Sequence, residues 1–202
     1  MMAGMDGYAD AHLHLMDMED DTGYECIKSA SLLLSCTSSH IQWDPQEELA
    51  RSDKRIFPFY GTHPWFCTEL PNRHIDHLSE FLDRNRRSGI GEIGLEGKRV
   101  CDPSQFKVFS EQLSLAKDMD RVAVIHMTGT EEQVLKEIKA NKGVRTILHS
   151  FAGSGNYLEP FEKAGCYFSL SPSMMIRSEM RFQALLMAVP KKKLLIESDA
   201  PS

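Results

Sequence analysis

The chain has 202 residues, of which 42% are hydrophobic and 26% are charged, and its formal net charge is −6. This composition is typical of a globular chain with one sizeable core, and it argues against a disordered or repetitive chain. The acidic balance also argues against a surface that is basic throughout and coats nucleic acid. A local basic groove or a bound metal could still attract phosphates.

Five cysteines are scattered along the chain without a C-x-x-C pair, which favours a reduced compartment over a disulfide framework. The first ten residues, MMAGMDGYAD, lack the basic and apolar regions of a signal peptide. No apolar run is long enough to cross a membrane. We therefore predict a cytoplasmic protein without a membrane partner, and the pattern indicates no particular oligomeric state.

Eight short apolar runs are typical of β-strands. In chain order they are GYADAHLHL (7–15), ASLLLSCTS (30–38), IFPFYGTHP (56–64), IGEIGLE (90–96), VAVIHM (122–127), TILHSF (146–151), CYFSLSP (166–172) and LLIESDAP (194–201). Between them lie stretches with apolar residues at helical spacing, such as 73–89, 104–120 and 130–143. In the last of these, Thr130 is the expected N-cap and Gly143 the expected stop.

Alternating strands and helices with nearly continuous apolar strands predict a parallel sheet covered by helices. Eight such units predict a (β/α)8 TIM barrel, formed as a single domain over residues 1–202. An open doubly wound sheet is the alternative, but it would want a glycine-rich turn after the first strand, and HLHLMDMEDD has none. The sequence ends just after the eighth strand, so we expect the barrel to lack its eighth helix.

Nearly every predicted strand carries a potential metal ligand at or near its carboxyl end. The candidates are His12, His14, His63, Glu92, His126, His149 and Asp199. The carboxyl ends of parallel barrel strands meet on one face, where barrel enzymes keep their active sites. Residues two apart on a strand point the same way, so Asp10, His12 and His14 share one side, with Asp10 deeper. Imidazole and carboxylate ligands suit divalent metals in mixed nitrogen and oxygen sites.

The prediction of a metal site depends on all the candidate ligands occurring together at strand ends, and not on any one of them. A single His-x-His is weak evidence, and a single strand histidine is more often structural. His74 and His77 lie on a predicted helix face, where solvated surface is the expected role. Cys67 and Cys101 are better explained as structural or incidental thiols, and the acidic run 18–21 as a solvated loop. Six metal-ligand candidates (all but His63) exceed the needs of one tetrahedral ion, which favours two ions bridged by one carboxylate.

At the level of motifs, the sequence resembles the TatD-type metal-dependent deoxyribonucleases, a family of amidohydrolase-like TIM barrels. DAHLHL resembles the family's opening D-x-H-x-H-L, GTHPW its third-strand G-x-H-P, and GEIGLE its fourth-strand G-E-I-G-L-D. LHSFAG resembles H-x-F-x-G on the sixth strand, and ESDAP resembles E-T-D-x-P on the eighth. These motifs run the whole length of the chain, and together they are highly specific.

The resemblance implies a role for each matching residue. His12, His14 and Asp199 would hold one divalent ion (Mg, Mn or Zn), Glu92 would bridge, and His126 and His149 would hold the second. Asp199 would also orient or deprotonate the attacking water, and His63 would contact the scissile phosphate. Asp10 would accept from an imidazole N–H. The implied substrate is DNA, as single strands or ends, with Trp43, Trp65 and Phe66 as candidate base-stacking residues.

The sequence departs from the family pattern at two places near the expected site. The fifth strand reads His126-Met127-Thr128 where the family has H-x-R, so a phosphate-binding arginine is missing. The fourth-strand motif ends in Glu96 instead of Asp, with Lys98 and Arg99 as nearby cations. Two alternatives therefore stay open: another hydrolase on the same metal site, acting on an amide, a lactone or a small phosphoester, and a non-catalytic metal-binding remnant.

Overall fold

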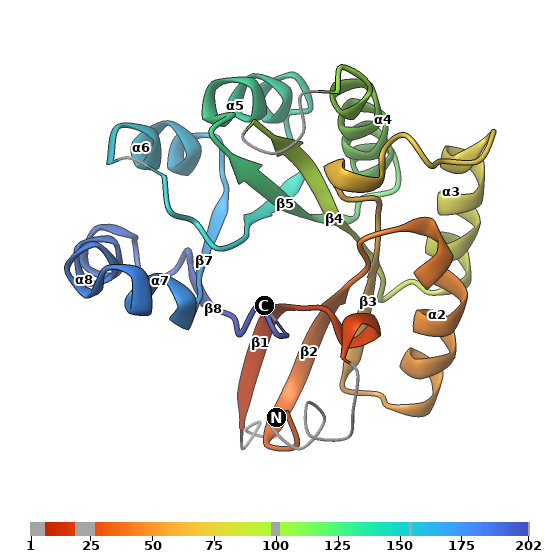
Figure 1. Ribbon diagram of the computed structural model, residues 1–202, viewed down its shortest axis with the longest axis horizontal. Helices are drawn as coiled ribbons and strands as arrows, with labels where there is room; N and C mark the ends of the chain where they lie inside the picture. Colours follow the sequence, from red (N-terminus) through yellow and green to blue (C-terminus); the bar gives the residue numbers. More distant parts are fainter. Residues whose placement is uncertain (1–6, 19–26, 98–101, 154, 202) are drawn as a thin grey trace.

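A computed structural model describes residues 7–18, 27–97, 102–153 and 155–201. Eight parallel strands form one sheet in the order β1-β2-β3-β4-β5-β6-β7-β8, which curls into a nearly closed barrel (Figure 1). The strands are β1 (Tyr8–Leu13), β2 (Ala30–Cys36), β3 (Ile56–Tyr60), β4 (Gly89–Glu96), β5 (Val122–Thr128), β6 (Arg145–Leu148), β7 (Tyr167–Leu170) and β8 (Leu194–Ile196). The predicted TIM barrel is confirmed.

Helices cover most of the outer face of the sheet, except at the edge where β8 meets β1 (Figure 1). The α-helices are α2 (Trp43–Ser52), α3 (His74–Arg84), α4 (Ser104–Asp118), α5 (Glu131–Ala140), α6 (Gly155–Lys163), α7 (Pro172–Arg177) and α8 (Glu179–Ala188), and the short 3₁₀ helices are η1 (Leu15–Asp17), η2 (His40–Gln42) and η3 (Pro64–Phe66). Both α7 and α8 lie between β7 and β8. Among these helices none is long and apolar enough to span a membrane.

The junction between β8 and β1 closes differently from the others. The Asp199 N–H donates to the His12 carbonyl at 3.0 Å, and the His14 N–H donates to the Ala200 carbonyl at 2.8 Å. As expected from the sequence, no helix follows β8 among the residues described up to 201, and Ile196 on β8 is 68% exposed. Backbone hydrogen bonds just beyond the strand ends therefore join the last strand to the first.

The inside of the barrel is filled below the carboxyl ends of the strands. Cys36, Phe59, Val124 and Ile147 form one buried cluster there. Val124 lies two residues before His126 on β5, so both side chains point to the inside. A second, larger cluster packs the helices against the outer face of the sheet. The packed interior holds the strands rigidly and fixes the directions of side chains at the mouth.

One local expectation is wrong in detail. Thr130 does occupy the N-cap position of α5, but its hydroxyl donates to the Leu95 carbonyl at 3.1 Å instead of capping the helix. The reason is that β4 ends beside the start of α5 and offers a buried carbonyl acceptor. Cys26, Cys101, Lys98, Arg99 and most of the acidic run 18–21 lie outside the described residues.

Candidate active site

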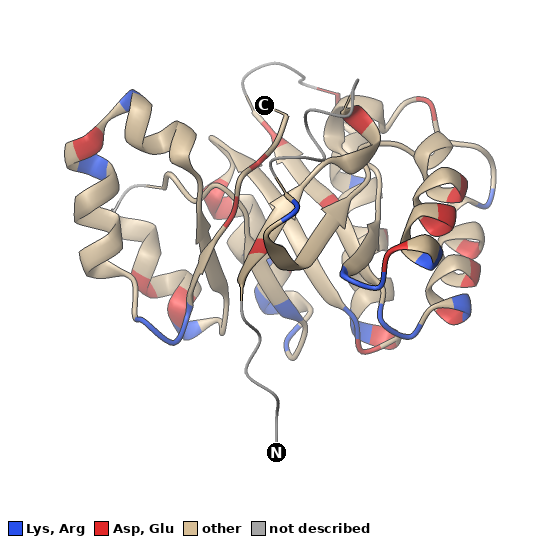
Figure 2. Cartoon of the chain, turned by 90° about the horizontal axis from the view of Figure 1, so that it is seen from below, with Lys and Arg blue, Asp and Glu red and all other residues tan. Residues whose placement is uncertain are grey.

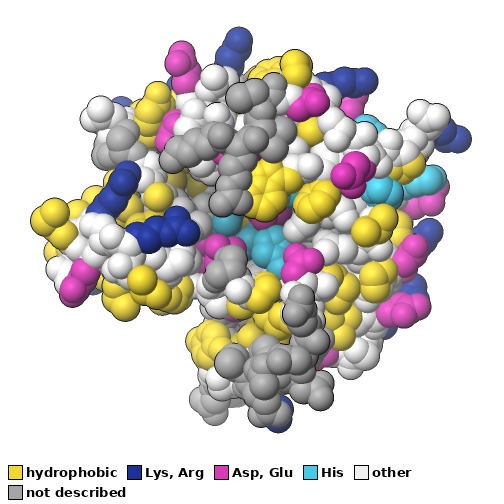
Figure 3. Space-filling view, viewed as in Figure 1, with side chains coloured by type: hydrophobic (Ala, Val, Ile, Leu, Met, Phe, Trp, Pro, Cys, Tyr) yellow, Lys and Arg dark blue, Asp and Glu magenta, His cyan; other side chains and the backbone are white. Residues whose placement is uncertain are grey.

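The predicted site residues meet at the mouth of the barrel. Histidine and acidic side chains gather at the centre of this face (Figure 3). They line a cavity of about 310 Å³, together with Asp17, Ser38, Trp65 and Pro201. His12 lies beneath the cavity and is fully buried. All seven residues singled out in the sequence are therefore brought together, although they come from six different strands or the loops that follow them.

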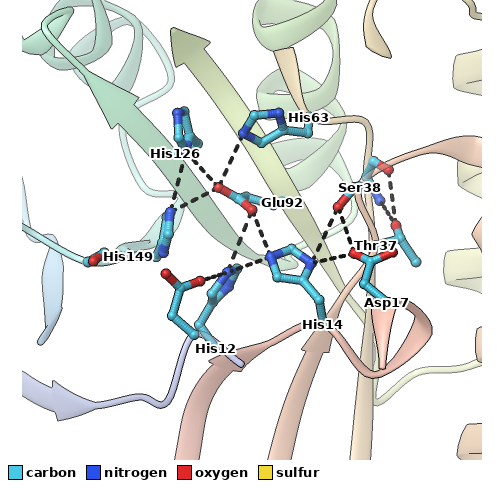
Figure 4. Close-up of polar contacts among 12 residues, drawn as sticks. His12, His14, Asp17, Thr37, Ser38, His63, Glu92, His126 and His149 are labelled. Atoms are coloured by element: carbon cyan, nitrogen blue, oxygen red, sulfur yellow. Dashed lines mark hydrogen bonds and ion pairs between the residues drawn. The ribbon is translucent and has the colours of Figure 1, made fainter. Parts of the chain in front are cut away.

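Glu92 is the centre of this arrangement, because each of its two carboxylate oxygens faces a different group of histidines (Figure 4). Oε2 lies 3.1 Å from His14 Nε2 and 3.6 Å from His12 Nε2. Oε1 lies 2.8 Å from His126 Nδ1 and 2.9 Å from His149 Nε2. A carboxylate placed between two pairs of imidazoles has the geometry of a bridging ligand.

The donor set fits divalent metal ions. The Nε2 atoms of His12 and His14 lie 3.0 Å apart and face the same oxygen of Glu92, which supplies two nitrogens and one oxygen. Three groups have ligand atoms that all lie within 4.8 Å of one another: His12, His14 and Glu92; His12, His149 and Asp199; and His63, Glu92 and His126. Such mixed nitrogen and oxygen sets are typical of Zn, Mn and Fe sites.

His63 lies close to Glu92 and His126, and not only beside the space where substrate would bind. Its Nε2 is 3.6 Å from Glu92 Oε1, and its ring is 4.3 Å from the ring of His126. Its Nδ1 accepts the backbone N–H of Trp65 at 3.2 Å. Burial lowers the pKa of His63 to about 4, so the ring is neutral near pH 7. Because Nδ1 accepts the Trp65 N–H, the neutral ring carries its proton on Nε2 and can donate a hydrogen bond to substrate from there.

Burial and neighbouring charges shift the pKa values of the site residues. Burial disfavours the charged form of Glu92, but His149, His63 and hydrogen bonds from His126 and His14 outweigh it, so the pKa of Glu92 is well below its usual value. Burial lowers the pKa of His12 well below 6.5. His149 is also buried, yet the negative charges of Glu92 and Glu197 raise its pKa well above its usual value. The site thus keeps Glu92 ionised and ready to bind cations.

Asp10 does not play the part expected from the sequence. Its Oδ1 accepts the backbone N–H groups of His12 at 3.2 Å and of Ser198 at 2.9 Å, not an imidazole N–H. The reason is that Asp10 lies one pleat below His12, where the backbone before Asp199 passes. Asp10 therefore fastens the segment after β8 to β1 and fixes the positions of His12 and Asp199.

Two outer groups of side chains were not found from the sequence. Asp17 and Ser38 approach His14 Nδ1 at 3.8 and 3.4 Å (Figure 4). The Gln42 side chain donates to Asp17 at 2.6 Å. On the other side, Glu197 lies 3.6 Å from His149 Nδ1. Carboxylates that contact the far nitrogen of a ligating histidine fix its ring orientation. The available signals were weak: Asp17 follows His14 by three residues, and Glu197 shares a strand face with Asp199.

Backbone geometry lets the strands approach closely enough to build the site. Gly94 on β4 has a φ of +149°, and a Cβ there would lie 2.0 Å from the His126 carbonyl oxygen. Only glycine fits beside His126 at this point. Asp199 has a φ of 55°, a left-handed conformation that aspartate tolerates better than most residues and that turns the chain after β8.

Among the candidate base-stacking residues, only Trp65 is well exposed, at 42%, and it lines the cavity. Trp43 is wrong as a stacking residue, because it is buried in the core and its Nε1 donates to the Gly61 carbonyl at 3.1 Å. Phe66 is half-buried. His77 is exposed as expected, but His74 is half-buried and lies 3.5 Å from Glu111.

Basic residues gather at the end of the barrel opposite the mouth. Lys54 and Arg55 precede β3, Arg121 precedes β5 and Arg145 begins β6. In Figure 2 many of the blue segments accordingly lie along the lower edge, where strands begin. Within the described part of the chain, the residues that line the mouth cavity include no lysine or arginine.

The sequence pattern of the TatD-related DNase family matches residues 9–202. The chain belongs to this family. It is 28% identical over 162 residues to the human 3'-5' RNA nuclease TATDN2, covering 77% of this chain and 21% of that protein. It is 26% identical over 150 residues to the uncharacterized metal-dependent hydrolase YabD of Bacillus subtilis, covering 72% of this chain and 59% of YabD.

Solved structures show the same fold. The crystal structure of the TatD homologue YjjV from Escherichia coli superimposes with a TM-score of 0.85 at 21% identity, covering 98% of this TatD chain and 81% of YjjV. A TatD-family hydrolase from Entamoeba histolytica gives a TM-score of 0.84 at 17% identity, covering 97% of this chain and 74% of that one. The chain spans about a fifth of human TATDN2 and about three fifths of YabD.

Proposed function

We propose that this TatD-family chain is a metal-dependent hydrolase that cleaves phosphodiester bonds of DNA, with two divalent ions (Mg, Mn or Zn) at the mouth of the barrel. The observation that carries the proposal is the position of Glu92, whose two oxygens face two separate pairs of histidines at 2.8 to 3.6 Å. Two-metal sites of this kind typically hydrolyse phosphate esters.

The residues divide into two ligand groups. His12, His14 and Asp199 would hold one ion, His126 and His149 the other, and Glu92 both. Bound ions lower the pKa of a coordinated water and stabilise negative charge on phosphoryl oxygens. Asp199 Oδ1 lies 3.5 Å from His12 Nε2 at the wall of the cavity, from where it can orient a water and accept its proton. His63 faces the same cavity and can contact a substrate phosphate.

The relatives favour nucleic acid as the substrate class. The relative named 3'-5' ssDNA/RNA exonuclease TatD, from Escherichia coli, is 26% identical over 160 residues, which cover 77% of this chain and 62% of that protein. Trp65 gives the mouth one exposed aromatic face on which a base can stack. Single-stranded DNA or DNA ends fit a narrow mouth of about 310 Å³ better than a continuous duplex.

A second candidate is a hydrolase of small substrates on the same metal site. The specific observation in its favour is that the described lining of the mouth carries no lysine or arginine. A nucleic-acid enzyme commonly contacts several phosphates with basic side chains, whereas an amide, lactone or small phosphoester needs only the ions. The remnant alternative is disfavoured, because all six predicted metal ligands are present and converge.

The test begins with metal content, measured by elemental analysis of protein purified without chelator, and with a gel assay on labelled single-stranded DNA. We expect close to two ions per chain, loss of cleavage with EDTA and recovery with Mg or Mn. Asp199→Asn and His126→Ala should abolish turnover, whereas Glu132→Gln on exposed α5 surface should not. Bound metal without DNA cleavage would favour the small-substrate hydrolase. No bound metal under any loading condition would refute the metal site.

A further inference from the structure

The imidazole of His126 is held from both sides. Its Nδ1 faces the centre of the site, 2.8 Å from Glu92 Oε1 and 3.4 Å from His149 Nε2. Its Nε2 points away from Glu92 and contacts Glu96 Oε2 at 3.3 Å and Thr128 Oγ1 at 3.2 Å. The ring therefore has an inner nitrogen directed to the proposed metal and an outer nitrogen directed to two oxygens.

Glu96 and Thr128 are neighbours across the two central strands. They pair in register at the carboxyl ends of β4 and β5, and the Gly97 N–H donates to the Thr128 carbonyl at 2.8 Å. They are also two of the positions at which the sequence departs from the family motifs given above. The structure shows that these two departures, 32 residues apart in the chain, meet at one nitrogen of one histidine.

The backbone of Glu96 is itself fixed from α4. The Glu96 N–H donates to Gln105 Oε1 at 2.8 Å, and Gln105 Nε2 donates to the Glu96 carbonyl at 3.2 Å. The Glu96 side chain is only 4% exposed. The clamp fixes the backbone from which the Glu96 carboxylate reaches His126, and close packing around so buried a side chain restricts its rotamers.

We propose that Glu96 is a positioning residue for the second ion, with Thr128 as its partner. The inference rests on the proposed two-metal site. In the metal-bound state, Glu96 Oε2 and Thr128 Oγ1 would both accept from the Nε2–H of His126. Nδ1, which faces Glu92 and His149, would then give up its proton and offer its lone pair to the ion. Hydrogen bonds to the outer nitrogen of a ligating histidine fix both its tautomer and its orientation.

The first test is a metal titration by calorimetry with Mn or Zn, on wild type and single variants. Glu96→Leu removes the acceptor oxygen with a side chain of similar size. It should lower the affinity for the second ion by about 10- to 100-fold and leave the affinity for the first ion, held by His12 and His14, unchanged. Glu96→Gln keeps an acceptor oxygen and should restore most of the affinity. Thr128→Val should weaken the second ion less than Glu96→Leu does, and Glu132→Gln on exposed α5 surface is the matched control.

The second test reads the tautomer directly. In long-range nitrogen–proton NMR spectra of the zinc-loaded protein labelled at histidine, we expect His126 to be ligated at Nδ1 and protonated at Nε2. Two results would overturn the inference: ligation of His126 through Nε2, or an unchanged affinity for the second ion in both Glu96→Leu and Thr128→Val. If wild type still binds two ions, the proposed function is unaffected by either result. A wild type that binds no second ion, with His126 unperturbed by metal, overturns both.

Discussion

Glu92 Oε1 lies 2.8 Å from His126 Nδ1, while the other oxygen of the same carboxylate lies 3.1 Å from His14. Substitution of Glu92 by Gln leaves the shape but removes the charge that both histidine groups share. We expect Glu92→Gln to lose both ions and to lower kcat/KM by at least about 100-fold, since an amide bridges two cations poorly. Metal content by elemental analysis and DNA cleavage at saturating Mn measure the two effects. Two ions retained in Glu92→Gln would contradict the bridging assignment.

Asp10 joins the segment after β8 to the first strand by hydrogen bonds, so its substitution should lower the stability of the fold. Asp10→Ala leaves the N–H groups of His12 and Ser198 without their buried acceptor, and we expect it to lower the free energy of unfolding by about 2–4 kcal/mol. Asp10→Asn keeps an acceptor oxygen and should cost less. Urea unfolding followed by circular dichroism measures both. Equal costs for Asn and Ala would show that the two hydrogen bonds are not the stabilising feature.

Trp65 should act on substrate and not on metal. Removal of its exposed ring in Trp65→Ala takes away a stacking surface worth about 1–3 kcal/mol per base, so we expect KM for single-stranded DNA to rise roughly 10- to 100-fold. Trp65→Phe should recover much of this. Steady-state kinetics on a short labelled oligonucleotide give the values, and metal content should equal that of wild type. An unchanged KM in Trp65→Ala would remove Trp65 from the substrate surface.

Burial raises the pKa of the Cys166 thiol from 9.0 to about 11. The unfolded chain therefore releases this proton at lower pH than the folded chain does. Stability from the protonated thiol is complete below pH 9 and is lost as the pH rises to about 11, by about 3 kcal/mol in all. Burial also raises the pKa values of Cys36 and Tyr60, so both proteins lose stability at high pH, and the test is the difference in unfolding free energy between wild type and Cys166→Ala, measured by urea unfolding at several pH values. This difference should change by about 3 kcal/mol from pH 8 to pH 11. Between pH 7 and 8 the unfolding free energies of the two proteins should change in parallel. If they stay parallel up to pH 11, the raised pKa of Cys166 is refuted.

The sequence predicted the barrel because each strand of the fold is an apolar run bounded by turns, and strand alternation placed His12 and His14 on one side. The family resemblance implied that Glu92 bridges two ions; this assignment stays a prediction, with which the contacts of the two Glu92 oxygens agree. It could not predict the contact of Glu96 with His126, because that contact depends on the register of β4 against β5. Nor could it show that Trp43 is buried, since exposure is decided by how α2 packs on β3.

Asp17, Ser38 and Gln42 illustrate the same limit. Each is an ordinary polar residue in a loop or a short helix, and none has a spacing that distinguishes it. They become important only because η1 and η2 lie against each other beside His14. Asp10 was placed correctly on the strand, but its partners were misjudged, since the backbone N–H of Ser198 arrives from the other end of the sequence.

The junction that joins Asp199 to His12 also sets the order in which this protein can become active during its synthesis. The two residues are 187 positions apart in the sequence, and the ribosome delivers His12 well before Asp199. Until the segment after β8 has emerged and reached β1, the growing chain holds the site histidines without the carboxylate of Asp199. On the proposed assignment, metal bound by such a chain would lack the aspartate that orients water, so a nascent chain should not hydrolyse the proposed substrate.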